Sequence, residues 1–179
     1  NWTVEKFDDS GCAHTSVNSS DKAYIGLKSL KHTVTDVTTN GGATFKQNFS
    51  SSNGIIEGGK TYTASAYINT SGLTRDADTN SSYDYGAAVM VSVETPSGET
   101  RYYSENIHKT DSTINDGWER AYTSFTVPQN YTNVSVNLVL RNATGTAYYD
   151  AIQLEEDDVA NAYNLLENND FTYSDSNGF

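Results

Sequence analysis

Apolar residues recur at every second position along many short segments of the chain. The clearest case is NVSVNLVLRN, residues 133–142, where the even positions from Val134 to Leu140 are all apolar. Because successive side chains of a β-strand point to opposite faces, such a segment buries one face and leaves the other free. No long stretch shows the 3.6-residue period of an amphipathic helix. The pattern therefore restricts the chain to all-β folds.

Each alternating segment is bounded by Gly, Asn, Asp or Pro, which favours short strands joined by tight turns. The turn sequence TPSG at 95–98 predicts a hairpin between strands expected at 83–94 and 99–107. About nine or ten strands are expected in all, which is the strand number of a sandwich or jelly roll. We therefore predict a two-layer antiparallel β-sandwich. The other expected strands cover residues 2–7, 27–37, 43–49, 60–69, 118–127, 133–142, 145–155 and 164–167.

The composition supports a folded domain and restricts its partners. Thirteen Tyr, six Phe and two Trp among 179 residues supply large apolar faces, and we expect Trp2 and Trp118 to anchor the core. The formal net charge of −12 argues against nucleic acid or an anionic membrane surface as partner, because the chain has no basic cluster. No run of about 20 apolar residues is present, so no membrane insertion is expected. Abundant Thr, Ser, Asn and Tyr favour an exported protein.

Catalytic chemistry has weak support in the sequence. Cys12 is the only cysteine, and His14 stands two positions after it, so on a strand the two would share a face. Such a pair would suit a nucleophile or a metal ligand set, but no further cysteine or matching Asn or Asp environment accompanies it. A small sandwich without a long insertion also offers little to desolvate a glycosidase carboxyl group. We therefore expect a chain that is not an enzyme.

The last residues, NLLENNDFTYSDSNGF at 164–179, have the pattern of a strand that opens a domain. The acidic segment before them, 156–163, lacks alternation and is the expected linker. We therefore predict one sandwich over residues 1–155 and a first-strand segment at 164–179. Because an isolated strand is rarely stable unless it pairs, this segment should complete its own sandwich as a circular permutation or enter a neighbouring copy by swapping.

Two stretches carry a family resemblance. GGKTYTASAYINT and GWERAYTSFTVPQNYTNVSVNLVLRNATGTAYYDAIQLEE resemble carbohydrate-binding modules of families 4, 9, 16 and 22, which have a galactose-binding-like jelly roll. Those modules typically run from an Asn-Leu-Leu strand through a Gly-Lys-x-Tyr-Thr strand to a final Tyr-x-Asp strand. The same order extends here from about residue 2 to residue 155. The resemblance implies a non-catalytic extracellular module that binds a polysaccharide or glycan.

The ending GTAYYDAIQLEE followed by YNLLENNDF also resembles tandem modules of bacterial cell-surface and wall-associated proteins. This resemblance implies a secreted or cell-surface location and neighbouring modules of the same polypeptide as partners. It also leaves an alternative open, a structural or adhesin-type repeat that does not bind sugar. Several exposed aromatic side chains around a groove would favour glycan binding, whereas a flat face lined by Ser and Thr would favour the structural repeat.

The family resemblance further implies a structural calcium ion near the first and last strands. Asp150 in YYDAIQL and Asp170 in NNDF occupy the matching motifs, and carboxylates suit such a hard cation. The acidic residue that follows the Phe in the family is Thr172 here, which removes one frequent ligand. The alternative is that Asp150 caps a turn.

Sugar recognition requires flat aromatic rings beside planar hydrogen-bonding groups, and in such jelly rolls the concave sheet carries them. Tyrosine is also a common filler of β-sheet cores, so a packing role is the alternative for each candidate. Five residues lie on expected strands that could line one face: Gln47, Tyr67, Tyr85, Tyr103 and Arg141.

Overall fold

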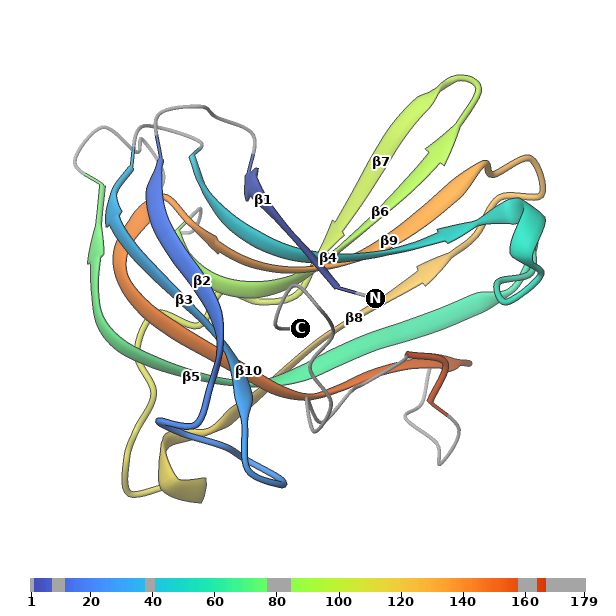
Figure 1. Ribbon diagram of the computed structural model, residues 1–179. Helices are drawn as coiled ribbons and strands as arrows, with labels where there is room; N and C mark the ends of the chain where they lie inside the picture. Colours follow the sequence, from blue (N-terminus) through green and yellow to red (C-terminus); the bar gives the residue numbers. More distant parts are fainter. Residues whose placement is uncertain (1, 8–11, 38–40, 77–84, 158–163, 167–179) are drawn as a thin grey trace.

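The computed structural model describes residues 2–7, 12–37, 41–76, 85–157 and 164–166. In this part of the chain, ten strands form two five-stranded sheets that pack face to face (Figure 1). Sheet A has the order β1 (Thr3–Phe7), β4 (Gly42–Ser50), β9 (Asn133–Arg141), β6 (Gly86–Thr95), β7 (Gly98–Tyr103). Sheet B has the order β2 (Ala13–Ser19), β3 (Ser29–Asp36), β10 (Ala143–Glu156), β5 (Thr61–Arg75), β8 (Glu119–Thr126).

The predicted fold class is confirmed, since every pairing in both sheets is antiparallel. The expected hairpin is present, with Thr95 opposite Gly98 at the β6–β7 turn. Two short 3-10 turns, Ser51–Asn53 and Asn115–Gly117, are the helical elements among the described residues. One strand was missed: β2 lies at the edge of sheet B, where its alternating half-exposed residues give a weak apolar pattern.

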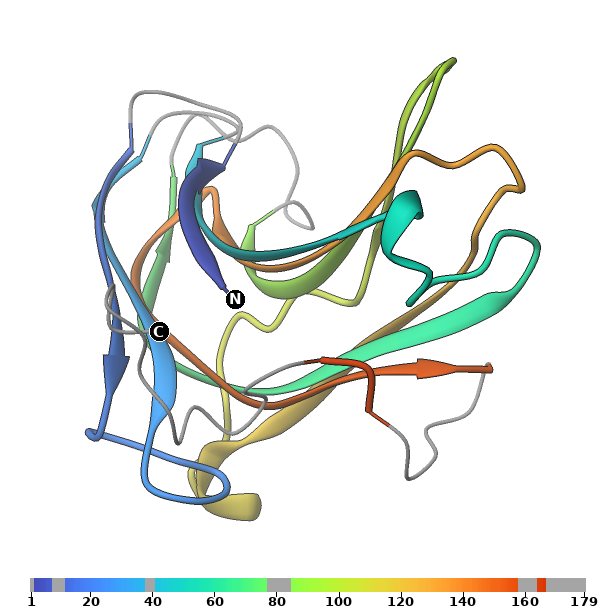
Figure 2. The same ribbon diagram turned by 45° about the vertical axis from the view of Figure 1, so that its right-hand side comes forward.

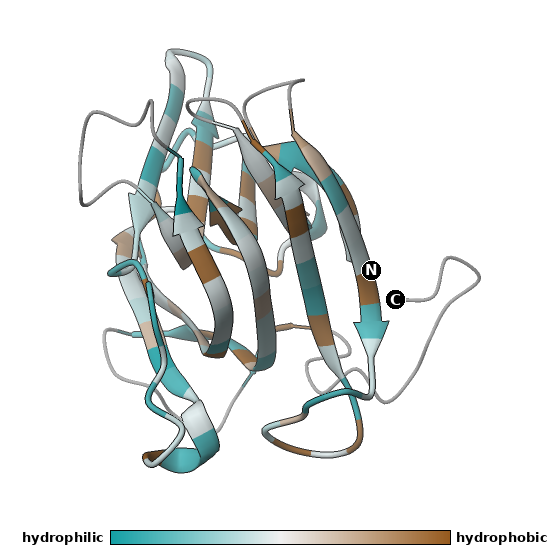
Figure 3. Cartoon of the chain, turned by 90° about the vertical axis from the view of Figure 1, so that its left-hand side faces the viewer, coloured by the Kyte–Doolittle hydropathy of each residue, from teal (hydrophilic) through white to brown (hydrophobic). Residues whose placement is uncertain are grey.

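The core lies between the two sheets. On β9 the even positions from Val134 to Leu140 are fully buried, and the odd positions of β6 from Ala87 to Val93 pack beside them. Figure 3 shows the resulting alternation of apolar and polar residues along the strands. Each fully buried Val or Leu contributes about 1.5–3 kcal/mol of transfer free energy, so this alternation is the main reason the chain forms a sandwich.

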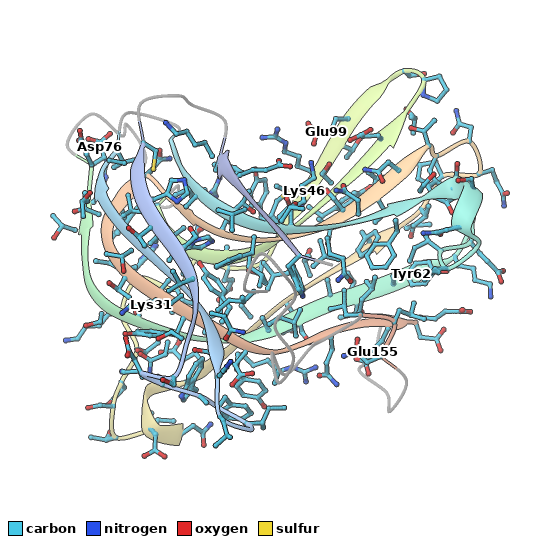
Figure 4. All side chains as sticks on the ribbon, viewed as in Figure 1. Lys31, Lys46, Tyr62, Asp76, Glu99 and Glu155 are labelled. Carbon is cyan, nitrogen blue, oxygen red and sulfur yellow. The ribbon has the colours of Figure 1, made fainter. Side chains whose placement is uncertain are left out.

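Several tyrosines fill the core, as the packing alternative anticipated. The hydroxyl of Tyr149 donates to the carbonyl oxygen of Val139 at 2.7 Å, which links the two sheets. Tyr62 lies between the sheets in Figure 4, and its hydroxyl accepts from the backbone N–H of Glu57 at 2.8 Å. Trp2 and Trp118 are both buried, as expected for anchors. The buried hydroxyls of Tyr62 and Tyr149 are tolerated because both have hydrogen-bond partners.

A chain of hydrogen bonds runs from β2 into the core. His14 Nδ1 lies 2.9 Å from Ser16 Oγ, which lies 2.6 Å from His32 Nδ1. On the other side of the ring, His32 Nε2 donates to the carbonyl oxygen of Leu138 at 3.2 Å, so Nδ1 is the acceptor for the Ser16 hydroxyl. Complete burial lowers the pKa of His32 to about 3, and the Leu138 hydrogen bond opposes this shift. His32 is therefore a neutral core residue.

Residues 164–166 lie along the second half of β10. Leu165 donates its N–H to the carbonyl oxygen of Leu154 at 2.8 Å, and the Asn164 amide donates to Ile152 O at 2.8 Å and accepts from Leu154 N at 3.0 Å. Leu166 is buried in the core. These contacts use the edge of β10 opposite β5, beyond the point where pairing with β3 ends. Because the rest of the segment lies outside the described residues, the permuted or swapped first strand stays a prediction.

Candidate functional site

The face of sheet A that points away from sheet B is concave and bears a groove. In Figures 1 and 2 its central strands β4 and β9 curve upward at both ends, with the β6–β7 hairpin rising at one side. The hollow has a volume of about 80 Å³, which is shallow beside the several hundred Å³ of an enclosing small-molecule pocket. A hollow this shallow can contact one side of an extended ligand but cannot enclose a small molecule. Its lining residues are Glu5, Lys6, Phe7, Thr44, Lys46, Met90, Ser92, Glu99, Arg101, Ser135 and Asn137.

The floor of the groove is polar although it is buried. Thr44, Ser92, Ser135 and Asn137 are all less than 5% exposed. Their side chains point to the outer face of sheet A, because the adjacent residues on the same strands point into the core between the sheets. The Asn137 amide donates to Ser135 Oγ at 2.9 Å and to Ser135 O at 3.1 Å, which fixes its plane. Hydroxyl and amide groups held in this way match the hydrogen-bonding needs of sugar hydroxyls.

Charged side chains line the groove, and Figure 4 shows Lys46 and Glu99 above the outer face of sheet A. Lys46 Nζ lies 3.6 Å from Glu5 Oε2, and Arg101 Nε donates to Glu99 Oε2 at 3.0 Å. All four side chains are partly exposed. Ion pairs of this kind contribute little stability, so their groups can exchange partners for a ligand at low cost.

An aromatic and cationic cluster closes one end of the concave face. Phe7 is buried on a small apolar floor and Tyr103 packs beside it. The Arg141 guanidinium lies over the Tyr103 ring at 4.3 Å, and that of Arg101 lies 5.7 Å from the Phe7 ring. These contacts are cation–π interactions and hold the two rings in place. The apolar floor consists of Ala88, Met90 and Val139.

The five predicted sugar-binding residues do not share a face. Tyr103 and Arg141 do lie together beside the groove. Tyr67 is on the outer face of sheet B, where its ring stacks on Tyr24 at 3.7 Å between centroids. Tyr85 precedes β6 and stacks on His108 while packing against the core. The expectation of one shared face is therefore wrong for Tyr67, because its strand β5 belongs to sheet B. It is also wrong for Tyr85, which leads into β6 of sheet A with the core-facing parity of Val89 and Val91.

Gln47 was placed on the wrong side of its strand. It lies opposite Val136 on β9, shares parity with Phe45 and Phe49, and is buried on the core side of sheet A. A polar glutamine is expected to face solvent. The β4–β9 pairing has no register shift, however, so Gln47 faces the core like Phe45 and Phe49. Neither its amide oxygen nor its amide nitrogen has a hydrogen-bond partner in the described structure.

Gln47→Met is expected to raise the free energy of unfolding by about 1 kcal/mol, because it removes an unsatisfied buried amide at nearly constant volume. Urea denaturation followed by circular dichroism measures the change. Gln47→Glu is the matched opposite case and should destabilise the fold, since it buries a charge at the same place. A destabilised Gln47→Met variant would contradict the placement.

Asp150 caps backbone N–H groups in the described structure, as the turn-capping alternative anticipated. Asp150 is fully buried, and its Oδ2 accepts from the backbone N–H groups of Tyr24 at 2.6 Å and Ile25 at 3.0 Å. Its Oδ1 accepts from the N–H of Ala151 at 2.7 Å. A calcium ligand needs free oxygen lone pairs, and three of the about four acceptor positions of this carboxylate already accept backbone hydrogen bonds. Asp170 lies outside the described residues, so a calcium ion held by Asp170 with other groups stays a prediction.

Most of the groove was missed from the sequence. Phe7, Thr44 and Lys46 had no signal of their own, because they come from strands whose neighbours in space are far away in sequence. Asn137 and Ser135 could have been found, since they alternate with the buried positions of β9.

Among the described residues, no cluster of three or more His, Cys, Asp or Glu is arranged to hold a metal ion. Cys12 is buried in the core, and His14 is bound to Ser16. No helix in the described part of the chain has the length and apolar content needed to span a membrane.

No family model matches the sequence, and no curated protein matches it. The fold has clear counterparts among solved structures. The C-terminal family 22 carbohydrate-binding module of Clostridium thermocellum Xyn10B matches with a TM-score of 0.54 and 15% identity, over 90% of this chain and 88% of the module. The chain shares the β-sandwich fold of this module. At this identity the likeness concerns the fold alone.

Two larger proteins contain the same fold. The N-terminal CBM22-1–GH10 part of C. thermocellum endo-1,4-β-D-xylanase 10B, solved with xylohexaose, matches with a TM-score of 0.56 and 11% identity over 87% of this chain. The enzymatically active domain of bacteriophage CBA120 tailspike protein 4 matches with a TM-score of 0.53 and 12% identity over 88%. The chain spans 26% of the xylanase and 19% of the tailspike, so it corresponds to one part of each.

Proposed function

We propose that the chain is a non-catalytic carbohydrate-binding module that holds a polysaccharide along the groove of sheet A. The observation that carries the proposal is the groove floor, in which hydroxyl and amide groups are fixed on a concave face at the end of which Phe7 and Tyr103 lie. The carbohydrate-binding fold of the structural counterparts supports the same role. An extended glycan offers both the hydroxyls and the apolar ring faces that such a surface recognises.

The non-catalytic part of the proposal rests on the carboxylates of the groove. Glu5 and Glu99 are 49% and 38% exposed, and each lies beside a cation. A glycosidase acid needs the opposite surroundings, burial away from water and from positive charge. The groove therefore favours binding over hydrolysis.

The alternative is a structural repeat of a bacterial surface protein. One observation favours it: the groove presents Ser, Thr and Asn with few exposed aromatic rings, since Phe7 is buried and Tyr103 half-buried. The concave shape and the adjustable charged walls favour glycan binding instead. We further propose an extracellular location at a bacterial surface, which both roles share and which the polar composition supports.

Lys46→Ala combined with Arg101→Ala is expected to weaken polysaccharide binding at least about tenfold, because both cations line the groove and can donate charge-assisted hydrogen bonds to a bound sugar. Affinity electrophoresis through gels that contain soluble plant and bacterial wall polysaccharides measures the change. The matched control is Lys31→Ala with Lys60→Ala, which removes the same charge from ion pairs elsewhere. If the wild-type protein is retarded by none of the polysaccharides, the structural-repeat role is favoured.

A further inference from the structure

A second hollow lies where the edges of the two sheets meet. β7 is the last strand of sheet A, β8 is the last strand of sheet B, and the two are in contact. The hollow has a volume of about 400 Å³, against about 80 Å³ for the groove. This volume falls in the range of sites for small molecules. Its lining residues are Tyr103, Ser104, Glu105, Ile107, Glu119, Arg120, Ala121 and Tyr122.

Tyr122 gives this edge hollow an open aromatic surface. The side chain is 64% exposed, the highest value among the described exposed aromatic residues. It makes no hydrogen bond or ring contact within the described part of the chain. An exposed ring at a hollow is a suitable platform for the apolar face of a sugar.

Two carboxylates, those of Glu105 and Glu119, line the same hollow as Tyr122. Glu105 follows β7 and Glu119 begins β8, and neither side-chain carboxylate forms an ion pair or hydrogen bond among the described residues. Carboxylate oxygens accept hydrogen bonds and can each bind sugar hydroxyls. The one guanidinium at the hollow belongs to Arg120, whose Nη2 already donates to Ser65 Oγ at 3.1 Å and Gln153 Oε1 at 3.3 Å. The local charge therefore disfavours anionic sugars.

The β7 side of the hollow is rigid. The Ser104 hydroxyl donates to Glu105 O at 2.9 Å and accepts from Val89 N at 3.0 Å. Ile107 exchanges backbone hydrogen bonds with Ala87, at 2.7 and 3.0 Å. A wall fixed by such contacts costs little ordering free energy when a ligand binds.

We propose that the edge hollow is a second glycan site, which takes a neutral or cationic pyranose unit against the Tyr122 ring with Glu105 and Glu119 as hydroxyl acceptors. Tyr103 lies at this hollow and also at the end of the groove, so the two sites are neighbours. The site stands on the geometry of β7 and β8 and does not require the groove to bind.

The test is a titration of the ¹⁵N-labelled protein, followed by amide chemical shifts, with oligosaccharides of xylose, glucose, mannose, galactose and glucosamine. We expect shifts at Ser104, Glu105, Ala121 and Tyr122 with at least one of these sugars. Tyr122→Ala should weaken that response about tenfold, whereas Tyr122→Phe keeps the ring and should preserve it. Oligogalacturonate, which is anionic, should produce no response there.

The two proposals fail separately in this experiment. The groove variant with Lys46→Ala and Arg101→Ala should lose the shifts at Thr44, Ser135 and Asn137 and keep those of the edge hollow. Shifts confined to the groove, or an edge response that Tyr122→Ala leaves intact, would overturn the edge site alone. No shift at either place with any sugar would overturn both proposals.

Discussion

Asp150→Ala is expected to lower the free energy of unfolding by about 3 kcal/mol, because three backbone N–H groups lose their acceptor in a buried place. Two of these groups belong to Tyr24 and Ile25, so the carboxylate also holds the loop before β3 against β10. Guanidinium denaturation monitored by tryptophan fluorescence measures the change. A loss below about 1 kcal/mol would contradict this capping role of Asp150, because a loss that small is expected for one exposed hydrogen bond and not for three buried ones.

Asp150→Asn is the matched control, because it retains one carbonyl oxygen and should lose less stability than Asp150→Ala. The same variants test the calcium prediction. We expect the destabilisation to be the same in calcium and in chelator, since the carboxylate already accepts hydrogen bonds from three backbone N–H groups. A wild-type melting temperature that rises with calcium, together with loss of that rise in Asp150→Ala, would instead make Asp150 a ligand.

Acidification from about pH 7 to about pH 5 is expected to lower the free energy of unfolding by about 2 kcal/mol through His32 alone. The pKa of His32 is about 3 in the folded protein and 6.5 without burial. As the pH falls below about 6.5, the unfolded chain binds the proton first and is stabilised relative to the folded state. The contribution of His32 is therefore complete above that pH and is lost progressively toward pH 3. Urea denaturation at a series of pH values measures the slope.

His32→Phe should flatten this pH dependence, since a ring of similar shape can still stack against Phe45 but cannot titrate. His14→Gln is the control. Partial burial and the charge of Lys6 also lower the pKa of His14, but this residue is only half-buried, so most of the slope should remain. An unchanged slope in His32→Phe would assign the pH dependence to other groups.

The fold could be predicted from the sequence because the alternation of apolar and polar residues along a strand is a local property. The even positions of β9 and the odd positions of β6 read as core faces, and both do form the interior. The TPSG turn also carried its own geometric signal. By contrast, β2 lies at an edge with weak alternation, so nothing local marked it as a strand.

The site was harder to predict from the sequence, because the order of the strands in the sheets decides which residues come together. Tyr67 and Tyr103 sit on strands of similar appearance, yet β5 belongs to sheet B and β7 to sheet A. Gln47 was misplaced because its polarity suggested solvent exposure, whereas the register of β4 decides its side. Tyr122 was missed because exposure of an edge residue depends on where the other sheet ends.

The pairings of sheet A contain no register shift, whereas those of sheet B are interrupted in β2–β3 and twice in β5–β10. Sheet A is consequently a regular lattice, in which positions such as Lys46, Asn137 and Met90 stand in one straight row across neighbouring strands. Exchanging residues of such a row alters the solvent face while the intervening positions keep the interior unchanged. Libraries that vary whole rows would therefore be a practical route to new ligand specificities on this scaffold.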